Sequence, residues 1–202
     1  MKKTHKILIG THNLGKFREI SALLPKKIFK ISPLDLGLKE PKETGKSFKE
    51  NSIIKAKYFY RKSQIPSISD DSGLMVECLK NKPGIHSARW AKKQGGFLKA
   101  MKKIIYEVNL ENFKKKKKNR RAKFICSLCF INEKGFITNK TGIIKGLISN
   151  KVKGRNGFGY DSIFIPIGRQ VTFGQMSKKL KMKIDHRYIA YKKIKNNLKF
   201  LK

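Results

Sequence analysis

Apolar runs and alternating positions along the chain predict a series of short strands. Continuous apolar segments at residues 6–10, 65–68, 122–132, 135–145 and 162–166 are typical of strands, and residues 74–79 alternate as a further strand would. The segments 122–132 and 135–145 are separated by a turn at Glu133, Lys134 and Gly135, so we expect them to form an antiparallel pair.

Helical spacing appears between these strands. A helix following Lys16 places Phe17, Ile20, Leu23 and Leu24 on one face. A second helix begins after Ser47, which forms a capping box with Glu50, and its buried side is expected to be Ile53, Ile54, Ala56 and Tyr58. A third helix covers residues 97–107. Residues 176–202 form a lysine-rich helical tail, with His186 and Arg187 near the start of its last helix.

Two adjacent carboxylates, Asp70 and Asp71, stand in a segment that is otherwise apolar and small. Such a pair suits a site that holds a metal ion or accepts a proton. Asp, Ser and Gly also build exposed turns, so an ordinary Asp-Asp turn is the alternative interpretation.

Two glycine-containing loops have the composition of ligand-binding loops. Residues 11–16 connect a strand to a helix, where backbone N–H groups and Lys16 would favour a phosphate, although an ordinary connection would have the same pattern. Residues 154–161 combine glycines with Phe158, Tyr160 and Asp161, so the backbone can approach a ligand closely and an aromatic ring can stack on a base. A flexible hairpin is the alternative.

The length of 202 residues fits one domain, or one domain with two lobes. The formal charge of +36 would attract anionic ligands, but the lysines are scattered, and the one dense run, Lys114 to Lys118, lies in a predicted loop. We therefore expect general lysine enrichment and no specific nucleic-acid partner. A nucleic-acid-binding module remains the alternative from another class, and it would leave Asp70 and Asp71 without a purpose.

Cysteine usage and hydropathy favour a cytoplasmic protein. Cys126 and Cys129 form one C-x-x-C pair inside an apolar run with no second ligand pair, so buried reduced thiols are expected. No apolar stretch reaches the length of a membrane span, and the segment that begins Met1-Lys2-Lys3-Thr4 shows no secretory signal.

Six motifs in register give the chain a family resemblance over nearly its whole length. The motifs are Thr11-His12-Asn13-Leu14-Gly15-Lys16, residues 43–51, Asp70-Asp71-Ser72-Gly73-Leu74, residues 83–89, Gly157-Phe158-Gly159-Tyr160-Asp161 and His186-Arg187. With these motifs in this order the chain resembles the inosine triphosphate pyrophosphatases, which hydrolyse dITP, ITP and XTP.

The resemblance implies an α/β fold with a long mixed central sheet flanked by helices. It also implies two lobes, within a single domain over residues 1–202, that enclose the active site in a cleft. The expected reaction cuts a purine nucleoside triphosphate between the α and β phosphates, giving the monophosphate and pyrophosphate, with Mg²⁺ as cofactor. A homodimer is expected as well.

The resemblance also implies roles for individual residues. Asp71 would activate the attacking water and share the metal, with Asp70 and Glu43 as supporting carboxylates and Glu40 as a competing choice. The substrate-binding residues would be Thr11, His12, Asn13, Leu14, Gly15, Lys16 and Ser72 for the triphosphate, Phe158, Gly159, Tyr160 and Asp161 for one wall of the base pocket, and Lys181, His186 and Arg187 for the 6-oxo edge.

Some positions depart from the family pattern. His12 stands where glycine is common, Ser162 where proline is common and Asp185 where serine is usual. The residues before Lys181 lack the usual acidic side chains, so Lys181 is matched mainly by its spacing to His186. A second enzyme hypothesis keeps the fold but takes a modified pyrimidine or a dTTP or UTP analogue, as in the septum-associated pyrophosphatases; the His-Arg pair disfavours it.

Overall fold

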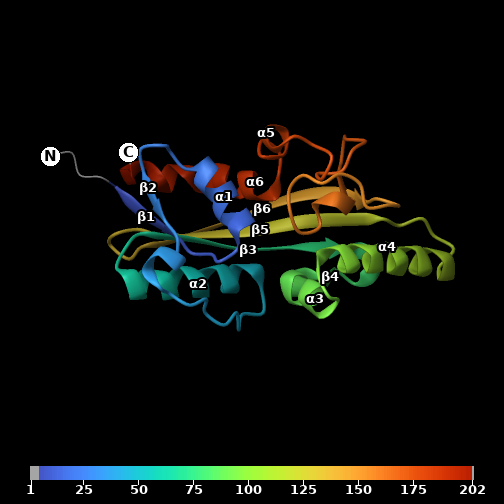
Figure 1. The fold of residues 1–202 in the computed structure, drawn as a ribbon, viewed down its shortest axis with the longest axis horizontal. Helices are drawn as coiled ribbons and strands as arrows, with labels where there is room; N and C mark the ends of the chain where they lie inside the picture. Colours follow the sequence, from blue (N-terminus) through green and yellow to red (C-terminus); the bar gives the residue numbers. More distant parts are fainter. Residues whose placement is uncertain (1–4, 202) are drawn as a thin grey trace. The chain divides into compact units, whose positions relative to one another are not determined.

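The computed structural model describes residues 5–201 and contains one mixed β-sheet (Figure 1). The sheet has seven strands in the order β2-β1-β3-β5-β6-β7, with β4 paired to β3. Strand β1 is parallel to both β2 and β3, whereas β4 is antiparallel to β3 and β7 to β6. The predicted α/β class with a long mixed sheet is therefore confirmed.

The chain divides into two compact units. The first unit comprises residues 1–71, 126–142 and 186–202, and the second comprises residues 72–125 and 143–185. Strands β3 (Ser67–Val76), β5 (Arg121–Ile131) and β6 (Ile137–Ile148) each contribute residues to both units.

Helices cover both faces of the sheet in the first unit. Helix α2 (Phe48–Ser63) lies on one face, and α1 (Leu14–Leu23) and α6 (His186–Ile194) lie on the other (Figure 1). The unit also contains β1 (Lys6–Ile9), β2 (Phe29–Ile31) and the 3-10 helices η1 (Leu34–Leu36) and η5 (Lys195–Leu201). Apolar residues of β1, α1, β5 and α6 form one buried cluster, which includes Ile7, Ile20, Phe130 and Ala190.

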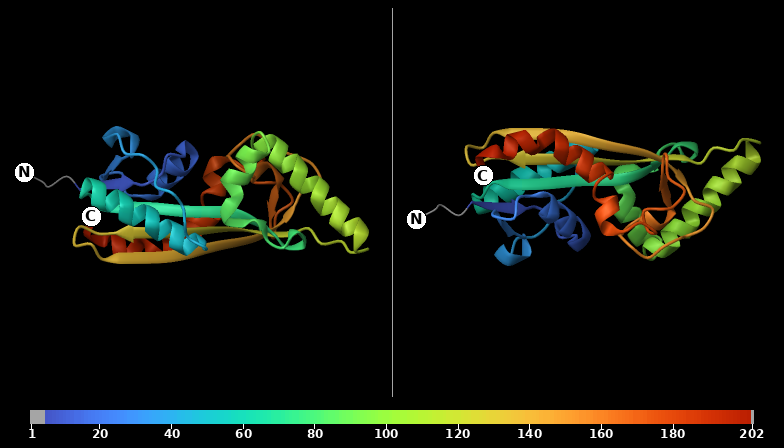
Figure 2. Two further views of the ribbon diagram at one scale, coloured as in Figure 1. Left: turned by 90° about the horizontal axis from the view of Figure 1, so that it is seen from below. Right: turned by 90° about the horizontal axis from the view of Figure 1, so that it is seen from above.

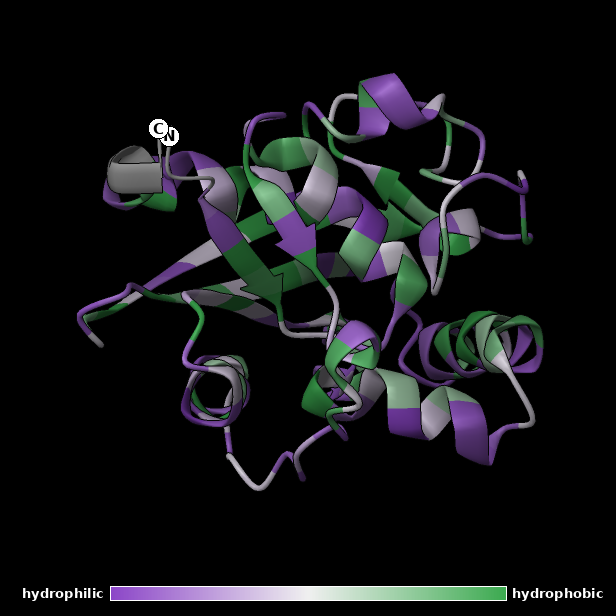
Figure 3. Cartoon of the chain, turned by 60° about the vertical axis from the view of Figure 1, so that its left-hand side comes forward, coloured by the Kyte–Doolittle hydropathy of each residue, from purple (hydrophilic) through white to green (hydrophobic). Residues whose placement is uncertain are grey.

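The second unit has its own core. Helix α4 (Phe97–Lys114) packs on α3 (Ser87–Lys93), and the rings of Phe124, Phe164 and Phe173 lie together within the core. Its remaining elements are β4 (Lys82–Pro83), β7 (Phe164–Pro166), α5 (Lys178–Lys181) and the 3-10 helices η2 (Glu77–Leu79), η3 (Gly84–His86) and η4 (Asp161–Ile163). In Figure 3 the central strands are mostly hydrophobic, and the helices carry both hydrophobic and hydrophilic residues.

Most predicted elements are present, with different boundaries. The Ser47 side chain caps α2 by accepting from the Glu50 N–H at 3.1 Å, as the capping box predicts. Hydrogen bonds from Asn132 N to Phe136 O and from Ile148 N to Arg120 O confirm that β5 and β6 are antiparallel. The separate strand predicted at 74–79 is wrong, because β3 runs without a break from Ser67 to Val76 and then enters η2. Helix α4 is longer than predicted, and β2 and α3 were not predicted.

The buried face of α2 differs from the predicted one. Its buried residues are Phe48, Asn51, Ser52, Lys55, Ala56 and Phe59, so of the predicted set only Ala56 is fully buried, and Ile53, Ile54 and Tyr58 are half-buried. Three polar side chains therefore face inward. Hydrophobic periodicity cannot detect a buried face whose polar groups are paired inside the protein.

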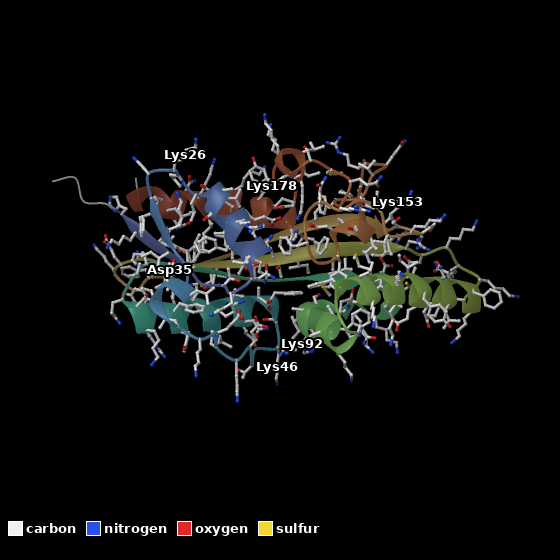
Figure 4. The ribbon with its side chains drawn as sticks, in the orientation of Figure 1. Lys26, Asp35, Lys46, Lys92, Lys153 and Lys178 are labelled. Atoms are coloured by element: carbon white, nitrogen blue, oxygen red, sulfur yellow. The ribbon has the colours of Figure 1, made fainter. Side chains whose placement is uncertain are left out.

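Several compositional predictions are confirmed. Cys126 and Cys129 are buried and no disulfide involves them, and burial raises the pKa of the Cys129 thiol to about 12. Exposed lysines come from elements throughout the chain, including Lys26, Lys46, Lys92, Lys153 and Lys178 (Figure 4). Within residues 5–201 no helix has the length and apolar character that a membrane span requires. The segment Met1 to Thr4 lies outside the described residues.

Helix α6 lies directly on the first half of β6, as the right-hand view of Figure 2 shows. Gly142 of β6 makes this approach possible, because a Cβ at this position would collide with the backbone at His186 O and Ala190 N. The contact leaves no room for even the smallest side chain.

We expect Gly142→Ala to lower the free energy of unfolding by roughly 1–3 kcal/mol, since overpacking against backbone cannot be relieved by a rotamer change. Urea titration, with unfolding monitored by circular dichroism, measures the free energy of unfolding of both proteins. Lys140→Ala, at an exposed position of the same strand, is the control and should stay within about 0.5 kcal/mol of wild type. Equal stability of the two variants would contradict the packing argument.

Candidate active site

The candidate site of the first unit lies where β3 continues beyond the end of β1. The last pairs between these parallel strands are Leu8 with Ser67 and Ile9 with Ile68. The next residues of β3 lead to Asp70 and Asp71, and the chain leaving β1 forms the loop of residues 10–13. Ligands in α/β proteins commonly bind at the carboxyl ends of parallel strands, which is where this pair stands.

Neither aspartate lies in an exposed turn. Asp70 is 0% and Asp71 4% exposed, and both belong to β3. Successive strand residues point to opposite faces of the sheet. Asp70 accordingly meets residues of α1 and α6, and Asp71 meets a residue of α2, on the opposite face. The turn alternative is thus excluded.

Cations surround Asp70. Its Oδ2 lies 3.0 Å from the Arg187 guanidinium and 3.4 Å from Lys16 Nζ. Burial by itself raises the pKa of a carboxyl group, but Lys16, Arg187 and Lys55 outweigh burial and hold the pKa of Asp70 well below its usual range. Asp70 is therefore a permanently ionised carboxylate.

Asp71 has a different environment. Burial raises its pKa to about 6, the charge of Lys16 lowers it and the charge of Glu43 raises it. The amide of Asn51 donates to Asp71 Oδ2 at 3.1 Å and lowers the pKa as well. A carboxyl group with a pKa near 6 is ionised at neutral pH and is a stronger base than an ordinary aspartate.

A buried lysine connects the carboxylates on the α2 side. Lys55 is 2% exposed, and its Nζ donates to Glu43 Oε1 at 3.2 Å and lies 3.5 Å from Glu40 Oε1. Burial alone lowers the pKa of a lysine, but the charges of Asp70, Glu43, Glu40 and Asp71 together raise the pKa of Lys55 above its ordinary value. This side chain is an ammonium at neutral pH.

Glu43 and Glu40 differ in their relation to Asp71. Glu43 is among the charges that raise the pKa of Asp71, whereas Glu40 is also 3.9 Å from His12 Nδ1 and is more exposed. Of the two candidates, the geometry favours Glu43 as the partner of Asp71.

Several residues of the loop before α1 have structural bonds. Asn13 Oδ1 accepts from Lys16 N at 3.0 Å and caps α1, while Thr11 Oγ1 accepts from Asn13 N at 3.2 Å. Leu14 and Gly15 open the helix, and His12 Nε2 lies 2.9 Å from Leu38 O. The positive end of α1 and Lys16 therefore stand beside Asp70.

The second unit gathers the predicted base-wall residues. Lys181 Nζ donates to Asp161 Oδ2 at 2.6 Å, and the same oxygen accepts from Phe158 N at 2.9 Å. The Lys181 ammonium lies 5.0 Å from the centroid of the Phe158 ring. Gly157, at a φ of 75°, is required here because a side chain would collide with Asp161 Oδ2.

The other predicted residues are placed as follows. Tyr160 is buried in the core of the second unit and donates to Ser87 O at 2.8 Å, so Phe158 is the half-buried aromatic of this loop. Gly159 takes a positive φ and Ser72 follows Asp71 in β3. His186 and Arg187 begin α6 and are buried, with Arg187 bonded to both Asp70 and Glu19. Base reading by Arg187 stays a prediction.

A groove of about 640 Å³ in the second unit contains none of the predicted site residues. Its walls come from β3, β5, β6 and the residue that follows β7, and they include Arg121, Lys123, Lys145, Leu147 and Ile167. This groove is basic but lacks the paired carboxylates.

The carboxylates of the first unit have the composition of a magnesium site. Within residues 5–201 no three His, Cys, Asp or Glu side chains gather closely enough to hold a metal by themselves. Mg²⁺ is commonly bound by only one or two carboxylates, with water and substrate phosphates completing its shell. Asp71 and Glu43 fit that arrangement. Asp70 Oδ2 is occupied by cations, although Asp70 Oδ1 is buried with no hydrogen-bond partner among the described residues.

Comparison with known families identifies the chain. The model of the Ham1 family matches residues 7–197. The chain belongs to the Ham1 family. It is 38% identical over 190 residues to a dITP/XTP pyrophosphatase of Zymomonas mobilis, covering 94% of this chain and 90% of that protein. It is also 38% identical to the dITP/XTP pyrophosphatase of Haemophilus influenzae, covering 96% of this chain and 98% of the relative.

Solved Ham1 structures share the fold. The HAM1 protein of Coxiella burnetii matches with a TM-score of 0.85 at 29% identity and covers 97% of this chain and 99% of that one. The Ham1 protein of Staphylococcus aureus matches with a TM-score of 0.78 at 32% identity, covering 98% and 100%. The resemblance to this family inferred from the six motifs is confirmed.

Sequence reasoning missed three buried polar residues near the aspartates: Glu19, Asn51 and Lys55. Each is a polar residue on a helix, so hydrophobic periodicity does not place it inside, and although Asn51 belongs to the motif of residues 43–51, the motif gives it no role. For Lys55 and Asn51, the signal was the spacing of four from Asn51 to Lys55, which places both side chains on one face of the helix.

The raised pKa of Asp71 predicts a pH-dependent stability. In the unfolded chain an aspartate has a pKa of about 3.9, so the folded protein binds a proton more tightly. The proton bound to Asp71 stabilises the folded protein fully below about pH 4. This stabilisation is lost as the pH rises through the folded-state pKa of about 6. Ionised Asp71 then costs on the order of 3 kcal/mol of stability.

Without divalent metal, Asp71→Asn should therefore be more stable than wild type at pH 7.5, by roughly 1–3 kcal/mol. The difference should shrink as the pH falls from about 6 to about 4. Urea unfolding of both proteins between pH 4 and 8 measures it. A variant that is less stable than wild type at pH 7.5 would contradict the assignment.

Proposed function

We propose that this chain hydrolyses the non-standard purine nucleotides dITP, ITP and XTP to the monophosphate and pyrophosphate, and so removes them from the nucleotide pool. Support comes from its membership in the Ham1 family and from relatives named dITP/XTP pyrophosphatases. The observation that carries the proposal is the buried pair of one ionised aspartate and one aspartate with a pKa near 6.

The proposed phosphate-binding groups are the N-terminal end of α1 and Lys16. Backbone N–H groups and the helix dipole favour an anion at this position, and a lysine adds a full charge. Thr11, His12, Asn13, Leu14 and Gly15 form the loop that presents these groups, and Ser72 stands next to Asp71. Phosphoryl transfer depends mainly on positioning and on neutralising negative charge, which this arrangement supplies.

Asp71 is the proposed general base. Its carboxylate would take a proton from the attacking water, while ionised Asp70 keeps Lys16 and Arg187 oriented. Asp71 and Glu43 would hold Mg²⁺, and Asp70 is a supporting carboxylate. The metal, when bound, would neutralise charge that develops on the phosphate oxygens.

The second unit supplies the proposed base reader. Phe158 offers a ring for stacking, Gly159 and Tyr160 shape its loop, and Asp161 holds Lys181 as a hydrogen-bond donor. A side chain that donates can bond to the 6-oxo group of hypoxanthine or xanthine, which accepts, but in adenine it meets another donor, the 6-amino group. His186 and Arg187 are further proposed readers of this edge. We also propose a homodimer that acts in the cytoplasm.

We expect wild type to release pyrophosphate from dITP and XTP with kcat/KM at least tenfold above that for dATP, since pairing at the 6-position of the base decides this selection. Guanine also carries a 6-oxo group, so selection against dGTP has to come from the 2-position; dGTP and dTTP complete the substrate panel. EDTA should abolish release. Asp71→Asn should lower kcat by roughly 100- to 10,000-fold because the base is lost. Pyrophosphate-coupled assays measure the rates, with circular dichroism as the folding control.

Full turnover by Asp71→Asn, or activity that persists in EDTA, would refute the assigned carboxylate chemistry. A preference for dTTP would favour the pyrimidine hypothesis over the purine one.

Lys181→Met is expected to reduce discrimination by the base. Loss of the donor should lower kcat/KM for dITP and XTP by about tenfold or more and that for dATP by less than about threefold. Lys178→Met, on the same short helix but exposed, is the matched control and should behave as wild type. Equal losses on dITP and dATP would show that Lys181 does not read the base.

A further inference from the structure

Asn51 is a fully buried side chain on the first turns of α2. We propose that Asn51 is a positioning residue, whose amide fixes Asp71 and the loop carrying Glu43 in a single arrangement. The inference rests on the proposed function, because it concerns the same carboxylates. It assigns a role to a side chain that is not itself expected to touch the substrate.

Both ends of the amide are engaged by protein groups. Asn51 Oδ1 accepts from Gly45 N at 2.8 Å, and Asn51 Nδ2 donates to Asp71 Oδ2 at 3.1 Å. The first partner requires an acceptor and the second requires a donor. The asparagine amide, with an acceptor oxygen and a donor nitrogen at any pH, meets both requirements.

The contact with Gly45 fixes the loop of residues 40–46. A Cβ on Gly45 would come within 2.7 Å of Asn51 Oδ1, so the loop backbone lies directly against the helix. Lys46 N also donates to Glu50 Oε2 at 2.8 Å, and Lys55 donates to Glu43. The N-terminal half of α2 thus attaches this loop at three points, and one of them also reaches Asp71.

The bond to Asp71 restricts rotation of its carboxylate. A hydrogen bond to one oxygen limits the rotation of a buried carboxylate, and the orientation of the carboxylate sets where it meets a water or a cation. Displacements of about 1 Å at a reacting group can cost on the order of 100-fold in rate. Loss of Asn51 should therefore lower kcat more than it lowers nucleotide affinity.

Ser52 provides a matched control next to Asn51. It is also fully buried on α2, but its hydroxyl lies 3.0 Å from Ser127 Oγ and accepts from Asn139 Nδ2 at 2.9 Å. These bonds attach α2 to β5 and β6 and do not involve Asp71. Ser52→Ala should therefore weaken the contact of α2 with β5 and β6 without altering the orientation of the Asp71 carboxylate.

The test compares Asn51→Asp and Asn51→Ala with wild type and Ser52→Ala. The aspartate variant has the same shape and keeps an acceptor for Gly45, but it turns a second carboxylate toward Asp71. We measure kcat for dITP at saturating Mg²⁺, and by calorimetry the Kd of an α,β-imido dITP analogue that resists hydrolysis. Circular dichroism reports folding.

We expect both Asn51 variants to lose at least about tenfold in kcat, with the Kd of the analogue changed by less than about threefold. Asn51→Asp should be no more active than Asn51→Ala. Ser52→Ala should have a lower Tm and a kcat within about twofold of wild type. If Asn51→Ala does not fold, the isosteric Asn51→Asp decides the question.

An Asn51→Asp enzyme with at least half of the wild-type kcat would overturn the inference, because a shape-filling role would then be sufficient. Equal loss of kcat in Asn51→Ala and Ser52→Ala would overturn it too. In both cases wild type releases pyrophosphate and the proposed function stands. Failure of wild type itself would instead remove the proposed function and, with it, the role of Asn51.

Discussion

The structure of the first unit depends on the burial of two adjacent carboxylates in one strand. Removing a carboxylate from water costs many kcal/mol unless charges and hydrogen bonds replace the solvent. Because neighbours in a strand face opposite sides of the sheet, Asp70 and Asp71 need separate compensation. On one side α1 and α6 bring Lys16 and Arg187 to Asp70, and on the other α2 brings the amide of Asn51 to Asp71.

Unequal compensation gives the two aspartates different chemistry. Asp70 has full charges beside it and stays ionised. Burial and the negative charge of Glu43 raise the pKa of Asp71, and Lys16, Lys55 and the Asn51 amide offset them only in part. A protein selected for stability alone would compensate the charges of both aspartates equally well. The poorer compensation of Asp71 is the kind of local cost that active sites retain, because a fully neutralised carboxylate would be a weak base.

Local patterns predicted much of the fold and part of the site. The β1 run, the Ser47 cap and the β5–β6 pair follow from short-range rules. The motifs predict Asp71, Lys16 and Lys181 as site residues, and in the structure Lys16 lies beside Asp70 and Lys181 bonds to Asp161. Other features depended on long-range pairing. Lys55 and Asn51 are polar and look solvent-exposed in sequence, yet carboxylates more than ten residues away in the chain make their burial favourable. The partners of Arg187 were also unpredictable, since Glu19 and Asp70 are distant in sequence.

The proposed nucleotide site is the carboxylate pair and the N-terminal end of α1, despite the many lysines elsewhere. A crystal structure of Asp71→Asn with dITP and Mg²⁺ is the decisive measurement, because the variant should bind substrate without cleaving it. We expect the phosphates to lie at the N-terminus of α1 and Lys16, beside residue 71. Nucleotide bound instead in the basic groove of Arg121, Lys123 and Lys145 would contradict it.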